Sequence, residues 1–300
     1  MKHLQEIVEA AQARGKKRLA VAYGQDSHTI EAVYDAYKEG LVEPILFGDS
    51  AVIEQVCQEL NIDSSIFTIV DEKNDVKAAN LAVTAVAKGE ADLLMKGTLP
   101  TDKYMRAILN KEAGLCPPKS VLGHVSVFEW AGYHKLLLAS DIAILPLPDF
   151  KQKQSLIGYI GKVANALEIA TPKIACIAAM ELVNVAMPAM AEAAILSKMA
   201  DRGQLGNVVV DGPLSLDVAL FKEVAEHKKV KGSAIAGDVD GLLFPNIEAG
   251  NVFFKSVSHL AGGELAAVVM GAKVPCVLTS RGDSAASKKY SIALACLLAK

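Results

Sequence analysis

The chain has 300 residues, of which 52% are hydrophobic and 22% are charged, and its formal net charge is −3. Because a single core stops growing at roughly 250 to 300 residues, this length favours two lobes. The weak net charge gives no field that would attract nucleic acid, no apolar run reaches the ~18 residues of a membrane span, and the N-terminus lacks the apolar segment of a signal peptide. We therefore expect a cytoplasmic protein that binds neither nucleic acid nor membrane, and the high hydrophobic fraction also fits a homo-oligomer.

The residue types that most often hold metals are scattered along the chain. The five cysteines form no C-x-x-C pair and mostly have apolar neighbours; they are Cys57, Cys116, Cys176, Cys276 and Cys296. The six histidines are dispersed as well, and no H-E-x-x-H helix occurs. The sequence thus predicts reduced, buried cysteines and no structural metal.

Apolar strand-like runs alternate with helical patterns, which is typical of parallel βαβ construction. The first half predicts, in chain order, a helix at 4–14, a strand at 18–23, a helix at 29–39, strands at 43–48 and 66–70, a helix at 75–88 and a strand at 92–96. The second half predicts a strand at 143–148, a helix at 155–167, strands at 173–177 and 208–210, a strand at 274–278 and a helix at 285–298. The fold class is therefore α/β with mostly parallel sheets.

The alternation restarts after about residue 133, and no Gly/Ser-rich or charged linker separates the two halves. The last strand and helix are expected to return and complete the sheet of the first lobe. We therefore predict a discontinuous first lobe of residues 1–133 and 268–300, and a second lobe of residues 134–267. The two lobes should pack around a cleft.

A polar loop near the C-terminus carries the strongest sign of chemistry. The segment 280–284, Ser-Arg-Gly-Asp-Ser, follows the strand expected at 274–278 and precedes the helix expected at 285–298. Ligand sites of α/β proteins lie at the carboxyl ends of strands, and a guanidinium beside a helix N-terminus suits a phosphate. A structural ion pair between Arg281 and Asp283 would explain the same residues, but the convergence of these two with two serines favours function.

A second polar loop follows the strand expected at 92–96. Lys96, Thr98, Thr101 and Arg106 lie on it or next to it, and together they could hold a phosphate or a diphosphate. In the alternative interpretation, Lys96 and Arg106 are ordinary surface charges and Thr101 is the N-cap of the following helix.

Three further segments have simple explanations. His124 and Ser126 would share one face of the apolar alternation at 121–129, where a lone histidine is more often structural than catalytic. The segment 211–213, Asp-Gly-Pro, fits a turn. The two carboxylates of 237–241 lack the other ligands of a calcium loop, so we expect a solvated turn there.

Five segments together resemble the phosphate acetyltransferase/phosphate butyryltransferase family over nearly the whole chain. They are Met95-Lys96-Gly97, Gly123-His124-Val125-Ser126-Val127-Phe128-Glu129, Asp211-Gly212-Pro213-Leu214, Phe244-Pro245-Asn246-Ile247-Glu248-Ala249-Gly250-Asn251 and Ser280-Arg281-Gly282-Asp283-Ser284-Ala285. The first and the last look more like the butyryl branch. The resemblance implies two three-layer α/β/α lobes like those of isocitrate and isopropylmalate dehydrogenases, an active site in the cleft between the lobes, and a homodimer formed mainly through the second lobe.

The resemblance also implies an enzyme that transfers an acyl group reversibly between coenzyme A and inorganic phosphate. In such enzymes a carboxylate deprotonates the coenzyme A thiol, which attacks the acyl phosphate in a ternary complex, and no metal or prosthetic group takes part. A thiol with a free pKa near ~8.5 needs such a base, and the developing oxyanion needs fixed donors. The acyl group expected for this chain is short and butyryl-like.

The family's motifs imply roles for particular residues. Arg281 is expected to hold phosphate, and Ser280 to support the thiol or the oxyanion. The acetyl branch has its aspartate base seven residues after that serine, where this chain has Ser287, so Asp283 on the same loop is the candidate base, with Glu248 and His124 next in line. The residues expected to bind substrate are Lys96, Thr98, Thr101, Arg106, His124, Glu248, Asn251 and Ser284.

Other interpretations of the same architecture remain open. Metal-dependent decarboxylating dehydrogenases and acyl-carrier-protein:phosphate acyltransferases resemble it too, so the fold alone does not decide. The dehydrogenases need a cluster of aspartates, and the sequence shows none arranged for a cation. A catalytically silent protein that binds coenzyme A or an acyl phosphate is favoured by Ser287, whereas the presence of both Ser280 and Arg281 argues against it.

Overall fold

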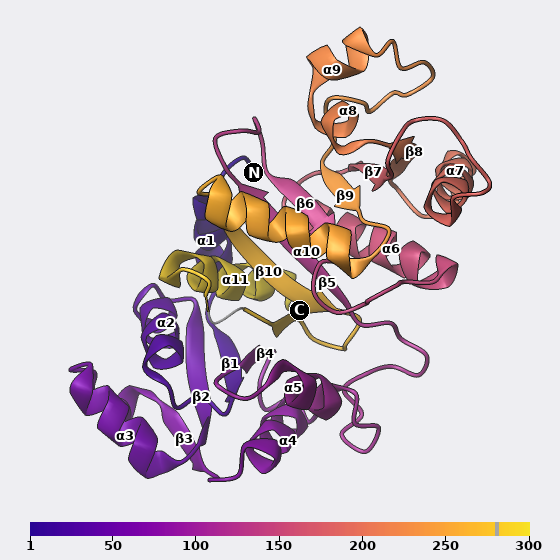
Figure 1. Cartoon of the computed structure of the whole chain (residues 1–300). Coiled ribbons are helices and arrows are strands. Elements are labelled where there is room, and N and C mark those ends of the chain that lie inside the picture. Colours follow the sequence, from indigo (N-terminus) through magenta and orange to yellow (C-terminus); the bar gives the residue numbers. More distant parts are fainter. Residues whose placement is uncertain (280–281) are drawn as a thin grey trace. The chain divides into compact units, whose positions relative to one another are not determined.

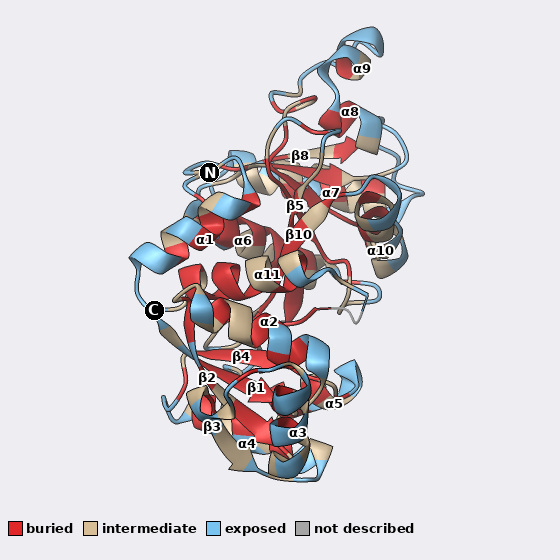
Figure 2. Cartoon of the chain, turned by 90° about the vertical axis from the view of Figure 1, so that its left-hand side faces the viewer, coloured by how far each residue is buried: buried red, intermediate tan, exposed pale blue. Residues whose placement is uncertain are grey.

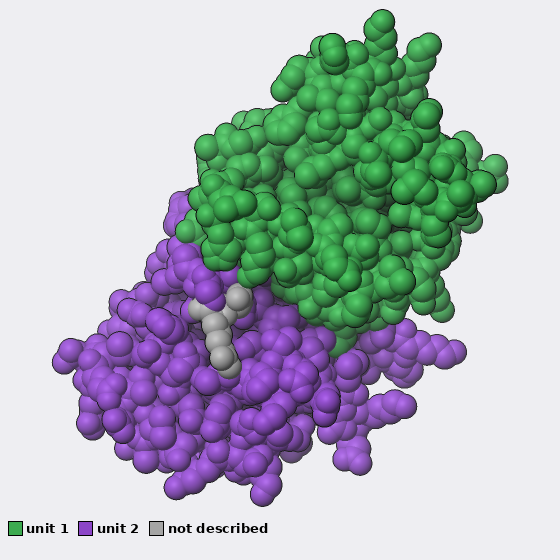
Figure 3. Space-filling view, viewed as in Figure 1, with its two compact units in different colours: residues 1–4, 121–265 green, residues 5–120, 266–300 purple. Residues whose placement is uncertain are grey.

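The computed structural model (Figure 1) describes residues 1–279 and 282–300. Contacts divide the chain into two compact units, drawn in different colours in Figure 3. Unit 1 contains residues 1–4 and 121–265, and unit 2 contains residues 5–120 and 266–300. The sequence assigned residues 121–133 to the first lobe, but β5 (Gly123–Glu129) pairs antiparallel with β6 (Leu137–Ser140), which ties that segment to unit 1.

Unit 2 is built on a mostly parallel sheet. Its strands follow the order β3 (Thr68–Asp71), β2 (Val42–Gly48), β1 (Lys17–Ala22), β4 (Leu93–Lys96), β11 (Cys276–Val277) and β10 (Glu264–Met270). β10 runs antiparallel to β11, and the other pairs are parallel. The helices of this unit are α1 (Leu4–Ala13), α2 (Ser27–Lys38), α3 (Ser50–Glu59), α4 (Asp75–Ala87), α5 (Thr101–Ile108) and α11 (Ala285–Leu298), with a 3₁₀ turn at Ser64–Ile66.

The helices of unit 2 begin at side chains that the sequence supplies as caps. Asp26, Asp49 and Asn74 each accept a hydrogen bond from a backbone N–H in the first turn of α2, α3 and α4. α4 packs on β1 and β2, and α11 packs on α2. Buried residues fill the strands between these helices, as Figure 2 shows for β1 and β4. Burial of these apolar strands, at about 25 cal/mol per Å² of apolar surface, is the main stabilising term.

Unit 1 contains strands in the order β5, β6, β9 (Gly241–Leu243), β7 (Lys173–Ile177) and β8 (Val209–Leu214). The strands from β6 to β8 are parallel. Its helices are α6 (Phe150–Ala166), α7 (Pro188–Asp201), α8 (Leu216–Leu220), α9 (Lys222–His227) and α10 (Ile247–Lys255), which continues as a π-helical turn at Ser256–Leu260. α6 packs on β5, β6 and β9, and α7 packs on β7 and β8. Within the described part of the chain, every helix is too short or too polar to cross a membrane.

The expected strand at 143–148 is wrong, since the chain there is irregular and the strand lies earlier, at β6. Pro146 and Pro148 have no N–H to donate to a ladder. The N–H groups of Ala143 and Ile144 donate instead to Asp141 Oδ1, both at 2.8 Å. The buried carboxylate of Asp141, rather than a neighbouring strand, therefore accepts the backbone hydrogen bonds of this segment.

The two turns expected at 211–213 and 237–241 also differ from the structure. β8 continues through Asp-Gly-Pro to Leu214, because an edge strand tolerates a proline. Asp240 is buried, and its oxygens accept from Lys135 Nζ at 2.7 Å and from the backbone N–H of Lys173 at 2.8 Å. The Asp240 carboxylate therefore bonds to Lys135 and to the start of β7 rather than facing solvent. All five cysteines are free; four of them are buried as predicted, whereas Cys116 is half-buried.

Gly97, directly after β4, gives a first testable prediction. A Cβ atom there would lie 2.2 Å from the carbonyl oxygen of Tyr23 and 2.8 Å from that of Ala22, so Gly97→Ala has to push the loop away from the end of β1. We expect the free energy of unfolding to fall by about 1–3 kcal/mol. Urea denaturation followed by circular dichroism measures it.

The matched control is Gly158→Ala in α6, where an added Cβ meets nothing within 4 Å. That change should stabilise the protein by about 0.5–1 kcal/mol, because alanine is the better helix former. Equal effects of the two substitutions would show that the close approach at Gly97 is unimportant.

Candidate active site

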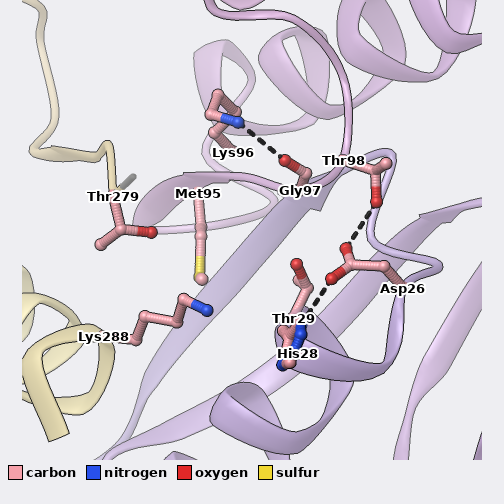
Figure 4. Close-up of a pocket in the computed structure, with 9 residues that line it drawn as sticks. All are labelled: Asp26, His28, Thr29, Met95, Lys96, Gly97, Thr98, Thr279 and Lys288. Atoms are coloured by element: carbon pink, nitrogen blue, oxygen red, sulfur yellow. Dashed lines mark hydrogen bonds between the residues drawn. The ribbon is translucent and has the colours of Figure 1, made fainter. Parts of the chain in front are cut away.

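A pocket of about 450 Å³ lies in unit 2 at the carboxyl ends of its parallel strands. β1, β4 and β11 are neighbours in the sheet, and the loops that follow them supply Asp26, Thr98 and Thr279. The first turns of α2 and α11 add further side chains (Figure 4). The lining residues are Asp26, His28, Thr29, Met95, Lys96, Gly97, Thr98, Thr279 and Lys288. The volume is within the range of about 300–1,000 Å³ that is usual for small-molecule sites.

Asp26 and Thr98 join two of these loops. Thr98 Oγ1 donates to Asp26 Oδ2 at 2.5 Å, and the backbone N–H of Thr29 donates to Oδ1 at 3.0 Å (Figure 4). Burial alone would raise the pKa of Asp26, but hydrogen bonds from Thr29 and Thr98 stabilise the carboxylate and bring the pKa below its ordinary value. Ionised Asp26, in the loop after β1, therefore holds the loop after β4 in place through its hydrogen bond with Thr98.

Two lysines line the pocket, and each is only 8% exposed. Lys96 Nζ donates to the carbonyl oxygens of Gly97 and Leu99, at 3.0 and 3.1 Å, so it holds the loop after β4 in shape. Lys288, in the first turn of α11, extends its Nζ toward the interior of the pocket (Figure 4). Two ammonium groups against one carboxylate make this pocket suited to an anion.

The loop expected to carry catalysis is only partly described. Ser280 and Arg281 lie outside the described residues. Thr279, which directly precedes them in the chain, lines the pocket. Asp283 is partly exposed in the bend before α11, and Ser284 is the N-cap of that helix, its Oγ accepting from the backbone N–H of Ser287 at 2.9 Å. Ser284 therefore has a structural role, whatever else it does.

Two candidates on α5 do not line the pocket. Thr101 is exposed and is the first residue of the helix, and Pro100 occupies the N-cap position that the alternative interpretation gave to Thr101. The Arg106 side chain is 83% exposed and forms an ion pair with Asp102 at 3.9 Å. Of the four residues expected to form one phosphate site, the pocket brings together Lys96 and Thr98.

Three candidates belong to unit 1. The backbone N–H of His124 donates to the side-chain oxygen Oδ2 of Asp141 at 3.0 Å. Asn251 Nδ2 donates to the backbone carbonyl oxygen of the following residue, Ile142, at 3.1 Å. His124 and Ser126 share a strand face as expected, with Nδ1 and Oγ 3.4 Å apart. Glu248, by contrast, is exposed in the first turn of α10. His124 and Asn251 thus meet at one loop, and the interlobe cleft stays a prediction.

Sequence reasoning missed several residues of the pocket. In the sequence, Asp26 has only the position expected of a helix cap. Four other residues belong to no recognisable motif: His28, Thr29, Thr279 and Lys288. The available signal was position, since Asp26 and Thr279 both follow apolar strands of a parallel sheet, where ligand sites gather. For Lys288 the available signal was a pair of adjacent lysines, Lys288 and Lys289, near the start of a mostly apolar helix that follows a polar loop.

The fold matches that of a known acyl-transfer enzyme. The crystal structure of a branched-chain phosphotransacylase from Enterococcus faecalis superposes with a TM-score of 0.82, at 30% sequence identity, over 94% of this chain and 98% of that one. This similarity defines the class as an α/β protein with the phosphotransacylase fold, and the mostly parallel α/β architecture predicted from the sequence is confirmed.

The sequence comparisons give the family. A phosphate butyryltransferase from Clostridium acetobutylicum is 43% identical over 299 residues, which cover 100% of this chain and 99% of the relative. A phosphate acetyltransferase from Thermotoga maritima is 43% identical over 296 residues, which cover 99% of each. The family model described as phosphate acetyl/butaryl transferase matches residues 2–82 and 72–296. The chain therefore belongs to the phosphate acetyl/butaryl transferase family, as its motifs predicted.

The bond between Thr98 and Asp26 gives a second prediction. Thr98→Val should lower the free energy of unfolding near neutral pH by about 1–3 kcal/mol, because the bond is to an ionised carboxylate. The folded-state pKa of Asp26 is lowered, so its contribution is present above the ordinary pKa of 3.8 and is lost as the pH falls through the lower folded value. The difference between variant and wild type should therefore shrink in strongly acidic solution, as measured by denaturation at a series of pH values.

Thr84→Val is the control, because Thr84 Oγ1 donates to the neutral carbonyl oxygen of Asn80 at 2.7 Å. Its effect should not change with pH. A pH-independent effect of Thr98→Val would count against a bond to ionised Asp26.

Proposed function

We propose that the chain is a phosphate acyltransferase that moves a short acyl group reversibly between coenzyme A and inorganic phosphate. The family match along nearly the whole chain carries this proposal. The relatives named as butyryl and acetyl enzymes are equally identical to it, and the Enterococcus faecalis enzyme is a branched-chain one. A butyryl-sized acyl group is the proposed substrate, with overlap toward its neighbours, because one methylene changes binding by only roughly 1–3 kcal/mol.

In the proposed reaction, the thiolate of coenzyme A attacks the carbonyl carbon of the acyl phosphate in a ternary complex, and phosphate leaves. The pocket in unit 2, with its lysines and hydroxyl groups, supports this proposal because it suits a phosphate. By the family's motif, Arg281 holds the phosphate, Ser280 supports the thiol or the oxyanion, and Asp283 takes the thiol proton. Coenzyme A enters as a substrate, and the scheme uses no metal or prosthetic group.

The release of free thiol tests the function. Purified protein is given phosphate and a series of acyl-coenzyme A esters from acetyl to valeryl, and the thiol is followed with a disulfide reagent. Phosphate-dependent release is expected, fastest near the butyryl ester. Binding of coenzyme A without release from any ester would overturn the proposal in favour of a catalytically silent binding protein.

Asp283→Asn tests the proposed base. For the reaction of coenzyme A with acyl phosphate, we expect turnover to fall about 10²- to 10⁴-fold with the fold intact, since general bases contribute that much, and we expect the acidic limb of the pH–rate profile, where a base becomes protonated, to change. Asp201→Asn, an exposed position in the last turn of α7, is the control and should be silent. A normal rate and profile for Asp283→Asn would assign the base to another residue.

We further propose that two copies of the chain associate through unit 1. The loop between β7 and α7 exposes large apolar side chains to an unusual degree, with Leu182 at 74%, Val183 at 61% and Val185 at 85%. Contiguous apolar surface of this kind marks contact sites between proteins. The backbone N–H of Ala178, where the loop begins, donates to the carbonyl oxygen of Leu214 at 2.9 Å, so the loop adjoins β8, an edge strand that a second copy could cover.

A charge in this loop should separate the copies. Sedimentation velocity is expected to show a dimer for the wild type and a monomer for Val185→Glu, because a buried, unpaired carboxylate opposes association. Leu109→Glu, which places the same charge on an exposed site of unit 2, should leave the dimer intact. A dimer that survives Val185→Glu would exclude this loop from the interface.

A further inference from the structure

Lys288 differs from the other deeply buried lysines. Among the described residues, three lysines are less than a tenth exposed, namely Lys96, Lys153 and Lys288. Lys96 donates to two backbone carbonyl oxygens, and Lys153 forms an ion pair with Glu192. For Lys288 Nζ, the described residues supply neither an acceptor at hydrogen-bond distance nor a carboxylate within 4.0 Å.

Residues 1–279 and 282–300 supply no group that compensates for the burial of this ammonium group. Removing an ammonium group from water is costly unless it gains a partner. Lys288 is the fourth residue of α11, and the positive end of the helix dipole makes a cation there less favourable still. The position therefore lowers the stability of the free protein, which indicates that the cation serves a bound molecule.

The side chain is aimed into the pocket of unit 2. Figure 4 shows Lys288 reaching past Met95 toward the space between α2 and the loop after β4. The pocket's own carboxylate is not its partner, because neither oxygen of Asp26 lies within 4.0 Å of Lys288 Nζ; these oxygens accept from Thr98 and Thr29. The pocket thus offers a cation that has no partner among the described residues and is placed to meet a bound molecule.

We propose that Lys288 binds a phosphate group of a substrate. This inference rests on the proposed function, which brings two sources of such a group to the protein: the phosphate or acyl phosphate itself, and the phosphates of coenzyme A. A phosphate group has several charged acceptor oxygens, which a lysine binds as a point charge. The hydroxyl of Thr279 lines the same pocket and is a second donor for such a ligand.

The test compares Lys288→Met with Lys289→Met. Lys289 is the next residue of the same helix, but it pairs with Glu39 at 3.1 Å and does not line the pocket, so its loss removes the same charge elsewhere. For each protein, the melting temperature is measured alone, with inorganic phosphate and with coenzyme A, and KM is measured for both substrates. Lys288→Met should raise one KM about 10- to 100-fold, the usual worth of a hydrogen bond to a charged group.

The thermal measurements separate a binding role from a structural one. Without ligand, Lys288→Met should melt at the wild-type temperature or above it, and it should lose the rise that the bound ligand causes in the wild type. A raised KM for phosphate alone assigns Lys288 to phosphate and acyl phosphate, and a raised KM for coenzyme A alone assigns it to the coenzyme; both support the proposal. Unchanged KM values with an unchanged ligand-induced rise would overturn it.

A failure of the proposed function can be distinguished from a failure of the assignment of Lys288. If the wild type releases no thiol from any ester, the acyltransferase proposal fails. The rise in melting temperature with phosphate or coenzyme A still tests Lys288 in that case, because the rise is expected in wild type and Lys289→Met and absent in Lys288→Met. A rise retained in all three proteins would overturn the assignment of Lys288.

Discussion

Parallel pairing of β4 with both β1 and β11 is the constraint on which the pocket depends. Parallel neighbours end at the same edge of a sheet, so loops that are far apart in the chain meet there without any attraction of their own. Gly97 lets the loop after β4 approach the end of β1 closely, and the bond from Thr98 to Asp26 holds it in place. The pairing of the strands therefore fixes where these loops lie, and the side chains of the pocket depend on that placement.

The two units differ in whether their charged groups find partners within the described part of the chain. In unit 1, the buried Asp141 accepts from three backbone N–H groups, and Lys135 and Lys173 surround the partly exposed Asp238. Burial alone would raise the pKa of Asp238, but hydrogen bonds and charge from the two lysines lower it. These groups are fully paired within the chain, which is the usual condition for a buried charge. In the pocket of unit 2, the ammonium group of Lys288 lacks such a partner among the described residues, and this difference separates a structural charge from one that serves a ligand.

The sequence allowed α1, α2, α4, α6, α11 and most parallel strands to be predicted, because their signals are local. Asp26 and Asn74 cap helices within their own first turns, and the apolar runs of β1 and β4 are buried whatever lies beside them. The errors have two causes. In the segment 143–148 the cause is local, because Asp141 accepts the N–H groups of Ala143 and Ile144, two and three residues further on, and the apolar pattern conceals this turn. At Asp240 the cause is a distant partner, because Lys135 forms an ion pair with a carboxylate that the sequence alone would place in solvent. The same applies to the site, since Lys288 and Arg106 are both helical cations, and only tertiary packing makes one buried and the other exposed.

The division of unit 2 into two stretches of chain has a consequence for synthesis. Unit 1 is encoded almost without interruption and is complete before the last strand and helix of unit 2 have left the ribosome. Until then β4 is an open edge, since β11 is the strand that lies between it and β10. Until β11 and α11 have been synthesised, the pocket lacks Thr279 and Lys288, and loss of the chain from β11 onward removes a strand from between β4 and β10 rather than a peripheral tail.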